Sequence, residues 1–526
     1  MSTISGNKLL QRIQAVWSSD RSAPALEFEG SWLTWGELRD AALAIDHALT
    51  EVGIGVGAPV GIFLRNRPGL IAALLAVLMS QRCIVSLSPF QPAGRQHEDL
   101  RKLKLPAVIA DAQDWAVEGT VGLAQDLGCL GLSLEQGRLA APRVVSSFQK
   151  RLPHHEDLSG TALEILTSGT TGAPKRIRIS YRTMEDSIVD GMTRNGKSGH
   201  GKTGDDNTGD GSPRKDTHAL NATPTLKATP TVMFAPLMHV SGLFGTLLAL
   251  YDGRPLVLLE KFSVDGWVEA VVRHKVRFGS LPPTPMRMVL DANVPREKLA
   301  SLLAVRAGTA PLSPRTQRDF ESRYGIPVLV QYGATEWMGG LAGWTLEDHR
   351  QYIATKLGSV GRPNGGVKLR VVDPDTGLEV PLRETGVLEV LPAQRLGVAE
   401  WMRTTDLASI DAEGFLYIHG RADDTIIRGG FKVRLNEVAE ILTHHPAVLE
   451  AAVIGLPDER LGQVPVAAIE CKPAAPRPSE AELKAYAQRH LTPYQVPVRF
   501  KLVAALPRTI SMKVSRPDVR ALFEID

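Results

Sequence analysis

One segment of the chain combines hydroxyls, glycines and a lysine at a spacing that suits a phosphate group. The segment Thr167–Lys175 follows a mostly apolar stretch, residues 163–166. Glycines let backbone N–H groups approach an anion, hydroxyls add donors, and a lysine supplies a positive charge. Its candidate phosphate-binding residues are Thr167, Ser168, Gly169, Thr170, Thr171, Gly172 and Lys175. These residue types predict a phosphate cradle, and a polar surface turn is the alternative.

The cradle does not fit the nucleotide loop of P-loop NTPases. That loop needs a glycine directly before its lysine and a serine or threonine directly after it. Here Pro174 precedes Lys175 and Arg176 follows it. The spacing therefore disfavours a P-loop NTPase.

The same cradle resembles the signature of the adenylate-forming (acyl-adenylating, AMP-binding) superfamily. This superfamily includes acyl- and aryl-CoA ligases, luciferases and the adenylation domains of peptide synthetases. Five further segments match in the family's order, and the resemblance extends from Trp32 to the C-terminus except for residues 194–218. It is strongest to the acyl/aryl-CoA ligase branch.

Two of these segments resemble the family's adenine and phosphate loops. The first contains Gln331, Tyr332, Gly333, Thr335 and Glu336. The resemblance implies that the tyrosine lies against adenine, the threonine bonds a phosphate and the glutamate holds Mg²⁺. An aromatic face suits a purine, and a hard carboxylate suits magnesium. The second segment resembles the loop along the adenine edge and contains Thr309, Ala310 and Pro311.

Two later segments resemble the ribose site and the hinge. By resemblance Asp406 binds the ribose hydroxyls, Arg421 contacts the ribose or a phosphate, and Asp423 is the pivot of a rotating C-terminal domain. Gly429 and Gly430 would line the pantetheine tunnel of a CoA ligase, although a plain β-turn needs glycines equally.

The sixth segment, residues 507–516, resembles the terminal loop that carries the family's adenylation lysine, which corresponds to Lys513. The implied reaction is attack of a carboxylate on the α-phosphate of ATP, with Mg²⁺ and the cradle neutralising the other phosphates. Lys513 would stabilise charge as it develops between the two anions. The acyl-adenylate then passes its acyl group to the thiol of coenzyme A.

His239 resembles the gate of the acid pocket in acyl and aryl ligases, although a buried structural histidine is the alternative. Amino-acid adenylation domains carry an aspartate in this neighbourhood, and this chain has none there. Its apolar neighbours favour an aryl or a short-to-medium-chain acid: Phe234, Leu237, Met238, Val240 and Trp337.

Four residues depart from the family pattern where it favours glycine: Arg176, Thr309, Thr405 and Met512. The retained side chains indicate a divergent but active enzyme. Two alternatives stay open. One is an acyl-adenylating enzyme that uses a carrier protein or another nucleophile as acceptor. The other is a non-catalytic adenylate-binding protein whose site the replacements have closed.

The elements that must position these residues alternate between short strands and helices. Short buried β runs at residues 60–64, 83–87, 231–235, 256–259 and 328–331 alternate with helical stretches such as residues 70–79. This alternation predicts a doubly wound sheet. Together with the resemblance, it predicts a large N-terminal domain of such sheets plus a small β subdomain (residues 1–419). A smaller, mobile α+β domain follows (residues 420–526) and contains a helix at residues 480–490.

Composition excludes several other classes of protein. The 526 residues are 43% hydrophobic and 22% charged, which is a globular mixture. A net charge of +3 gives no argument for nucleic acid or an anionic membrane. The three cysteines have neither zinc-site nor disulfide-framework spacing, and the ten-residue apolar run 70–79 is too short to span a bilayer. We expect a cytoplasmic enzyme whose partners are ATP, CoA and a small carboxylic acid. The oligomeric state stays open, with a homodimer as one option.

Residues 194–218 interrupt the pattern. They include six glycines and no aliphatic or Phe, Trp or Tyr side chain. Such a segment buries too little apolar surface to offset its ordering entropy, so we predict a disordered loop.

Overall fold

The computed structural model describes residues 6–149, 157–167, 175–195, 226–391, 400–473, 475–509 and 514–524. The chain forms two compact units. The first comprises Met1–Leu166 and Arg176–Gly366, and the second comprises Thr167–Lys175 and Val367–Asp526. The predicted disordered loop lies, after Asn195, outside the described residues.

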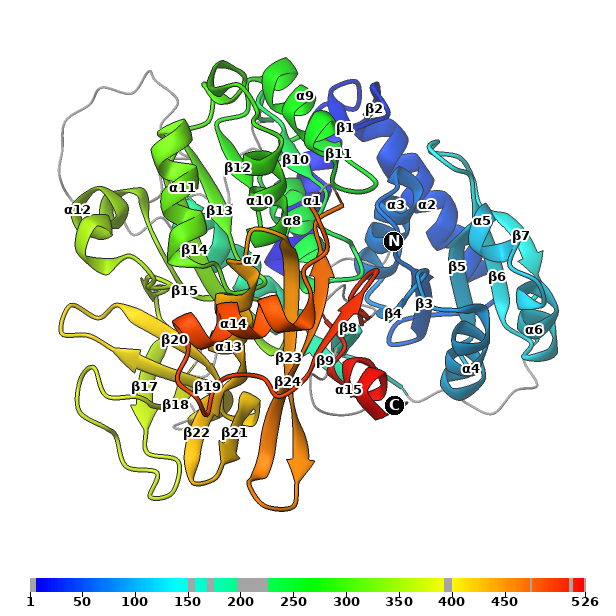
Figure 1. Ribbon diagram of the computed structural model, residues 1–526. Helices are drawn as coiled ribbons and strands as arrows, with labels where there is room; N and C mark the ends of the chain where they lie inside the picture. The colour runs from blue at the N-terminus through cyan, green and yellow to red at the C-terminus, as the bar shows by residue number, and fades with distance from the viewer. Residues whose placement is uncertain are drawn as a thin grey trace, which may run out of the picture. The chain divides into compact units, whose positions relative to one another are not determined.

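A seven-stranded sheet, with the strand order β7-β6-β5-β3-β4-β8-β9, forms one layer of the first unit (Figure 1). Its strands are β3 (Pro59–Phe63), β4 (Cys83–Leu87), β5 (Ala107–Asp111), β6 (Leu130–Leu134), β7 (Arg143–Ser146), β8 (Thr161–Thr167) and β9 (Lys175–Ser180). The pairs β3/β4, β3/β5, β5/β6 and β4/β8 are parallel. Every residue of β3 to β6 is buried, as expected for parallel strands covered on both faces.

Helix α3 (Pro68–Met79) follows β3 and is buried along its whole length. Pro68 occupies the first turn, where its missing N–H removes no helical hydrogen bond. The prediction of a buried helix over residues 70–79 is confirmed. In the described part of the chain, no helix is long and apolar enough to cross a membrane.

Two further sheets complete the first unit. One has the order β10-β11-β1-β2, with β1 (Pro24–Phe28), β2 (Ser31–Thr34), β10 (Thr231–Met233) and β11 (Leu256–Leu258). The other has the order β12-β13-β14-β15-β16, with β12 (Phe278–Ser280), β13 (Ala304–Ala307), β14 (Val328–Ala334), β15 (Gly339–Gly343) and β16 (Arg362–Pro363).

The remaining helices of the first unit connect and cover these strands (Figure 1). They are α1 (Lys8–Ser19), α2 (Trp35–Glu51), α4 (Ala93–Leu103), α5 (Ala112–Trp115), α6 (Thr120–Asp126), α7 (Tyr181–Asn195), α8 (Val240–Tyr251), α9 (Val264–His274), α10 (Pro283–Asp291), α11 (Pro314–Tyr324) and α12 (Leu346–Lys356). Helix α2 begins with a capping box in which Thr34 and Glu37 bond each other's backbone N–H.

The second unit begins with an antiparallel sheet of β17 (Lys368–Val372), β18 (Gly386–Leu391), β19 (Met402–Ile410) and β20 (Leu416–Arg421). A second sheet follows, with β21 (Thr425–Arg428), β22 (Phe431–Arg434), β23 (Val448–Asp458), β24 (Gly462–Cys471) and β25 (Phe500–Val503). Its helices are α13 (Leu435–Thr443), α14 (Glu480–His490) and α15 (Arg516–Glu524).

Side-chain alternation along β23 gives the second sheet two buried faces. Ala451 and Val453 pack in a cluster with residues of α13 and α14. Ala452 and Ile454 pack in another cluster with residues of α15. Because successive strand residues point to opposite faces, one strand serves both cores.

The predicted fold class is confirmed: a mixed α/β chain with a large N-terminal part and a smaller C-terminal domain. Strand β4 and helix α14 begin and end where the sequence places them, and β3 lies one residue earlier than expected. The domain boundary at residues 419 and 420 stays a prediction. The second compact unit starts earlier, at Val367, but compactness does not decide which segments move together.

Candidate active site

The phosphate cradle lies between two strands that are neighbours in the seven-stranded sheet. Thr167 ends β8 and Lys175 begins β9, while residues 168–174 between them lie outside the described residues. Lys175 is exposed, as a lysine that meets a dissolved anion must be. The two residues that flank the cradle segment therefore lie on neighbouring strands, and the roles of the cradle residues stay predictions.

Arg176 is one of the departures from the family pattern, and its side chain makes polar contacts with other parts of the same sheet. Its guanidinium donates to the backbone oxygen of Ser86 at 3.2 Å and lies 3.8 Å from the carboxylate of Glu164. Burial lowers the pKa of the Arg176 guanidinium, and the negative charge of Glu164 opposes this effect. Arg178 donates to the same carboxylate at 3.1 Å. The side chain of Arg176 therefore joins β9 to β4 and β8.

The two segments assigned to adenine and phosphate lie at the ends of neighbouring parallel strands: one follows β13, and the other, Gln331–Glu336, forms the end of β14 and the turn after it. β13 pairs with β14 through Val305 and Val328, so their carboxyl ends meet at one edge of the sheet. A Cβ on Gly308 would lie 3.2 Å from the backbone oxygen of Gln331, which shows how closely the loop after β13 approaches β14. Ligands of open α/β sheets bind at this kind of edge.

Thr309, which stands where the family favours glycine, has a backbone conformation typical of glycine. Its φ is +69°, in the left-handed region that a β-branched residue rarely occupies. Such strain costs on the order of 1–3 kcal/mol and persists where the surrounding structure imposes it. The loop therefore takes at Thr309 a conformation that glycine adopts without strain, and Thr309, Ala310 and Pro311 are exposed.

The end of β14 is shaped by a close approach of β15. Gly333 pairs with Gly340, and the register shifts between Tyr332 and Gly333. A Cβ on Gly333 would lie 2.3 Å from the backbone oxygen of Gly339. β-Bulges of this kind re-aim the side chains that follow them. The glycine of this motif is thus a steric requirement of the strand pair.

Glu336 lies in the short 3₁₀ helix η3 (Thr335–Trp337) directly after β14. The carboxylate of Glu336 is exposed, and Tyr332 and Thr335 are half-buried. Among the described residues no group of three or more His, Cys, Asp or Glu side chains forms a metal cluster. Nucleotide sites typically hold Mg²⁺ with one or two carboxylates and the substrate's phosphates, so a single exposed glutamate fits this ion.

Helix α8, which begins directly after His239, lies close in the fold to the segment that follows this loop. His239 is the N-cap residue of α8, after β10, and it is half-buried. Ser187 of α7 donates to the backbone oxygen of Trp337 at 3.0 Å, and the ring of Phe244 on α8 lies 3.8 Å from where a Cβ on Gly339 would stand. The helix that carries the predicted acid gate therefore packs beside the predicted metal loop.

The ribose and phosphate residues of the second unit are cross-strand partners. Asp406 on β19 lies directly opposite Arg421 on β20. Facing residues of an antiparallel pair have Cβ atoms about 4.5–5.5 Å apart, so the two side chains start from neighbouring positions on one face of this sheet. Thr405 lies in β19 between Arg403 and Leu407, where the pairing with β18 shifts register, and it is exposed, so the strand leaves room for its side chain.

Gly429 and Gly430 form the two-residue turn of the β21–β22 hairpin, with φ values of +56° and +91°. Two successive left-handed residues are the pattern of a type I′ turn, which strongly favours glycine. The turn alone accounts for both glycines, so their assignment to a pantetheine tunnel stays a prediction.

Lys513 lies outside the described residues, but both ends of its loop are held. Arg508 and Val514 form a β-bridge, and the backbone N–H of Ser515 donates to Pro507 at 2.8 Å. Arg508 also donates to Glu450 at 2.5 Å. Arg516, at the start of α15, bonds Asp424, the residue after the predicted pivot Asp423.

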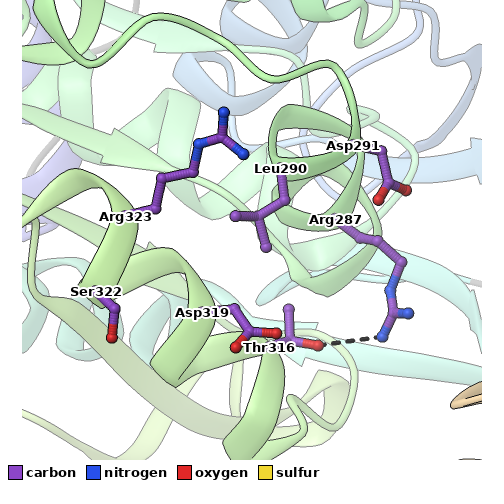
Figure 2. Close-up of a pocket in the computed structure, with 7 residues that line it drawn as sticks. All are labelled: Arg287, Leu290, Asp291, Thr316, Asp319, Ser322 and Arg323. Atoms are coloured by element: carbon purple, nitrogen blue, oxygen red, sulfur yellow. Dashed lines mark hydrogen bonds between the residues drawn. The ribbon is translucent and has the colours of Figure 1, made fainter.

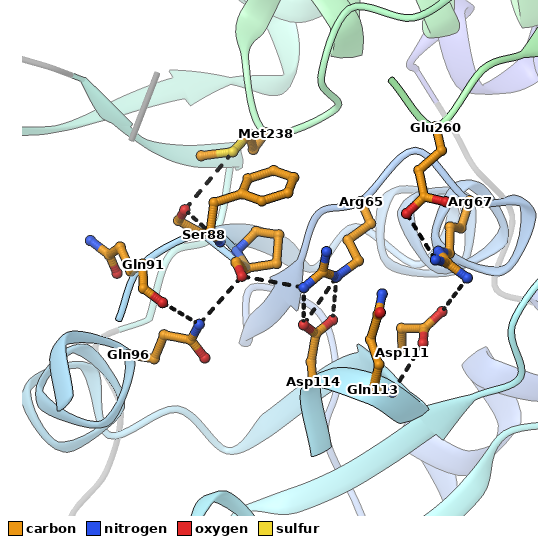
Figure 3. Close-up of polar contacts among 12 residues, drawn as sticks. Arg65, Arg67, Ser88, Gln91, Gln96, Asp111, Gln113, Asp114, Met238 and Glu260 are labelled. Atoms are coloured by element: carbon orange, nitrogen blue, oxygen red, sulfur yellow. Dashed lines mark hydrogen bonds and ion pairs between the residues drawn. The ribbon is translucent and has the colours of Figure 1, made fainter. Parts of the chain in front are cut away.

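The sequence did not reveal a cluster of hydrogen-bonded polar side chains at the carboxyl end of β3. This cluster, called the polar node below, centres on Arg65, Asn66 and Arg67, which precede α3. Arg65 donates to both carboxylate oxygens of Asp114, and Arg67 bonds Glu260 at 2.8 Å (Figure 3). Burial raises the pKa of the Asp114 carboxyl, and Arg65 opposes that shift. Three consecutive polar residues between a buried strand and a buried helix, residues 65–67, are the sequence signal that could have revealed the polar node.

A surface hollow of about 510 Å³ lies between α10 and α11. It is lined by Arg287, Leu290, Asp291, Thr316, Asp319, Ser322 and Arg323 (Figure 2). Arg287 donates to Thr316 at 3.1 Å, and the two arginines are balanced by two aspartates. The hollow contains none of the predicted site residues.

Comparison with known proteins decides the family. The model of the AMP-binding enzyme family matches residues 13–391, and that of the AMP-binding enzyme C-terminal domain matches residues 437–513. The chain belongs to the AMP-binding enzyme family. The predicted resemblance is confirmed.

Relatives and solved structures of this family span nearly the whole chain. Sulfoacetate–CoA ligase of Cupriavidus necator is 29% identical, covering 93% of this chain and 92% of that protein. 2-Succinylbenzoate–CoA ligase of Bacillus pumilus is 26% identical, covering 95% and 96%. The amide bond synthetase McbA of Marinactinospora thermotolerans superposes with a TM-score of 0.75 at 25% identity, covering 98% of this chain and 100% of that one.

Proposed function

We propose that the protein is an ATP-dependent acid–CoA ligase of the AMP-forming type. It activates a carboxylic acid as an acyl-adenylate and transfers the acyl group to the thiol of CoA. The observation that carries this proposal is that CoA ligases match over 93% and 95% of the chain. The Thr309 loop and the end of β14 that contains Tyr332 share one edge of the sheet, which supports a nucleotide site of the expected kind.

The predicted roles divide between the two units. In the first unit Thr309, Ala310, Pro311 and Tyr332 would hold adenine, and Thr335 would bond a phosphate. Mg²⁺ on Glu336 would neutralise phosphate charge. In the second unit Asp406 would accept hydrogen bonds from the ribose hydroxyls, with Arg421 opposite it. These assignments are proposals.

Lys513 would provide the charge that brings two anions together. The carboxylate attacks the α-phosphorus, the bond to the pyrophosphate leaving group breaks, and pyrophosphate departs with its electron pair. Most of the barrier is charge and positioning, which a fixed lysine lowers. The mixed anhydride then reacts with the thiol, AMP leaves, and the thiol proton is lost to solvent or a base.

We infer that the acid is an aryl or a short-to-medium-chain acid. Of the apolar residues near His239, Phe234, Leu237 and Met238 are at most 7% exposed and belong to the core. His239, Val240 and Trp337 are half-buried, so their side chains are partly accessible to a substrate. A cytoplasmic location stays a prediction.

A second candidate keeps the adenylation step and changes the acceptor. The 25% identity to an amide bond synthetase supports an amine as the other nucleophile. A carrier-protein thiol is a further form of the same alternative.

One assay separates these candidates. ATP-dependent pyrophosphate release is measured over a panel of aryl, short-chain and medium-chain acids, with and without CoA, and products are identified by mass spectrometry. Turnover with CoA and a thioester product supports the ligase. Pyrophosphate release without thioester, followed by amide formation when amines are added, supports the second candidate. No release with any acid would contradict both and favour a non-catalytic adenylate-binding protein.

A further inference from the structure

Asn66 is a buried amide that joins three strand ends. It follows β3, the central strand of the seven-stranded sheet, and is 3% exposed. Its Nδ2 lies 3.1 Å from the backbone oxygen of Phe234, 3.2 Å from that of Ala235 and 3.1 Å from that of Leu259. Its Oδ1 accepts from the backbone N–H of Leu237 at 2.9 Å. One side chain therefore fixes the segments that follow β10 and β11.

The segment that Asn66 holds leads directly to His239. The backbone N–H of His239 donates to Pro236 at 2.9 Å, and the backbone oxygen of His239 accepts from Leu243 at 3.0 Å. A Cβ on Gly242 would lie 2.2 Å from the backbone oxygen of Pro236. The segment is thus wound tightly against the start of α8, and a shift at residues 234–237 must carry His239 with it.

Other contacts of the same node support this arrangement. Arg67 bonds Glu260, which is the residue after Leu259, and Ser88 contacts the sulfur of Met238 at 3.9 Å (Figure 3). Both lie beside the backbone that Asn66 bonds. A buried amide such as that of Asn66 holds a local geometry firmly, because each bond that it fails to make leaves a desolvated group unpaired.

We propose that Asn66 is a positioning residue for the acid pocket. It fixes the backbone of residues 234–237 and, through it, the place of His239. The inference rests on the proposed function for its kinetic consequence. Its structural consequence, a firmly held segment 234–243, does not depend on any substrate.

Asn66→Asp is the sharpest test because it keeps the shape of the side chain. A carboxylate can still accept from Leu237, but it cannot donate to the three carbonyl oxygens and repels them. Asn66→Ala removes all four bonds. Gln317→Ala is the matched control: Gln317 is 2% exposed and its side-chain amide bonds Glu321 and Val328, away from this segment.

Hydrogen exchange of the apoprotein tests the structural part of the proposal, that Asn66 holds residues 234–243 in place. In both Asn66 variants we expect the amides of residues 234–243 to exchange at least about tenfold faster, with other regions changing less. Gln317→Ala should leave this segment at the wild-type rate. Unchanged exchange in the folded Asn66 variants would overturn the proposal, whether or not a substrate is known.

Steady-state kinetics test the functional part of the proposal, that Asn66 positions His239 for binding of the acid. With the best acid of the panel, we expect the KM for the acid to rise about tenfold and the KM for ATP to stay within about twofold. Combining Asn66→Ala with His239→Ala should add little to His239→Ala alone, because both changes act through one side chain. Equal losses for acid and ATP, or fully additive effects, would overturn the positioning role. Wild-type inactivity on every acid would instead defeat the proposed function, and the exchange experiment would still decide the role of Asn66.

Discussion

Gly333→Ala tests whether the close approach of β14 and β15 controls the nucleotide loop. A Cβ at this position would stand 2.3 Å from the backbone oxygen of Gly339 and 3.0 Å from the Cα of Gly340. Contacts below 3.0 Å are essentially never found, and both neighbours are backbone atoms that cannot rotate away. The two strands must therefore separate at this point.

The distance by which the two strands must separate sets the size of the expected loss of stability and activity. Relief of the contact needs a shift of roughly 0.7–1 Å, and overpacking of this kind costs about 1–3 kcal/mol of stability. Tyr332, Thr335 and Glu336 lie within three residues of the contact and move with the strand. A misplacement of about 1 Å can reduce a rate about 100-fold, so we expect a fall of about that size in kcat/KM for ATP.

The assay is pyrophosphate release with ATP varied and the acid saturating, together with a thermal melt. Gly343→Ala is the matched control on the same strand pair, because its Cβ would meet its nearest neighbour at an ordinary 3.4 Å. It should keep kcat/KM for ATP within about threefold of wild type. If Gly333→Ala retains wild-type kcat/KM, or if Gly343→Ala loses as much, the steric argument is wrong.

Three further predictions follow from individual residues. Lys513→Ala should abolish acyl-adenylate formation but spare thioester formation from pre-made acyl-adenylate, since the lysine acts only where two anions meet; equal loss of both half-reactions would contradict its role. Thr309→Gly should raise the free energy of unfolding by about 1 kcal/mol by relieving the strain at φ +69°, and a lower denaturant midpoint would show that the threonine side chain makes a compensating contact. Burial raises the pKa of the Cys83 and Cys129 thiols to about 12, so both stay protonated at pH 8. A thiol reagent should therefore titrate at most Cys471 in the native protein and all three cysteines in denaturant, and two or more reactive thiols in the native state would contradict this.

Much of the fold could be predicted because its signals are local. The apolar run of residues 70–79 and Pro68 before it are sufficient for a buried helix. The β-rich run of residues 83–87 coincides with β4. Such patterns record burial and backbone preference residue by residue, so they survive in a single sequence. Likewise the residue types of the Thr167–Lys175 and Gln331–Glu336 segments, and their order, point to nucleotide chemistry before any contact is known.

The sequence by itself thus determined the elements, the family and the kinds of side chain available for chemistry. Only the tertiary structure decided which of them meet. It places Asp406 opposite Arg421, brings the Gly308 loop against Gln331, and lets Asn66 bond strand ends about 170 to 190 residues away. It also shows that Thr309 keeps a glycine-like backbone and that Arg176 is used in packing. The physical reason is that register, close approach and long-range hydrogen bonds depend on the packing of segments distant in the chain, which no local pattern of residues encodes.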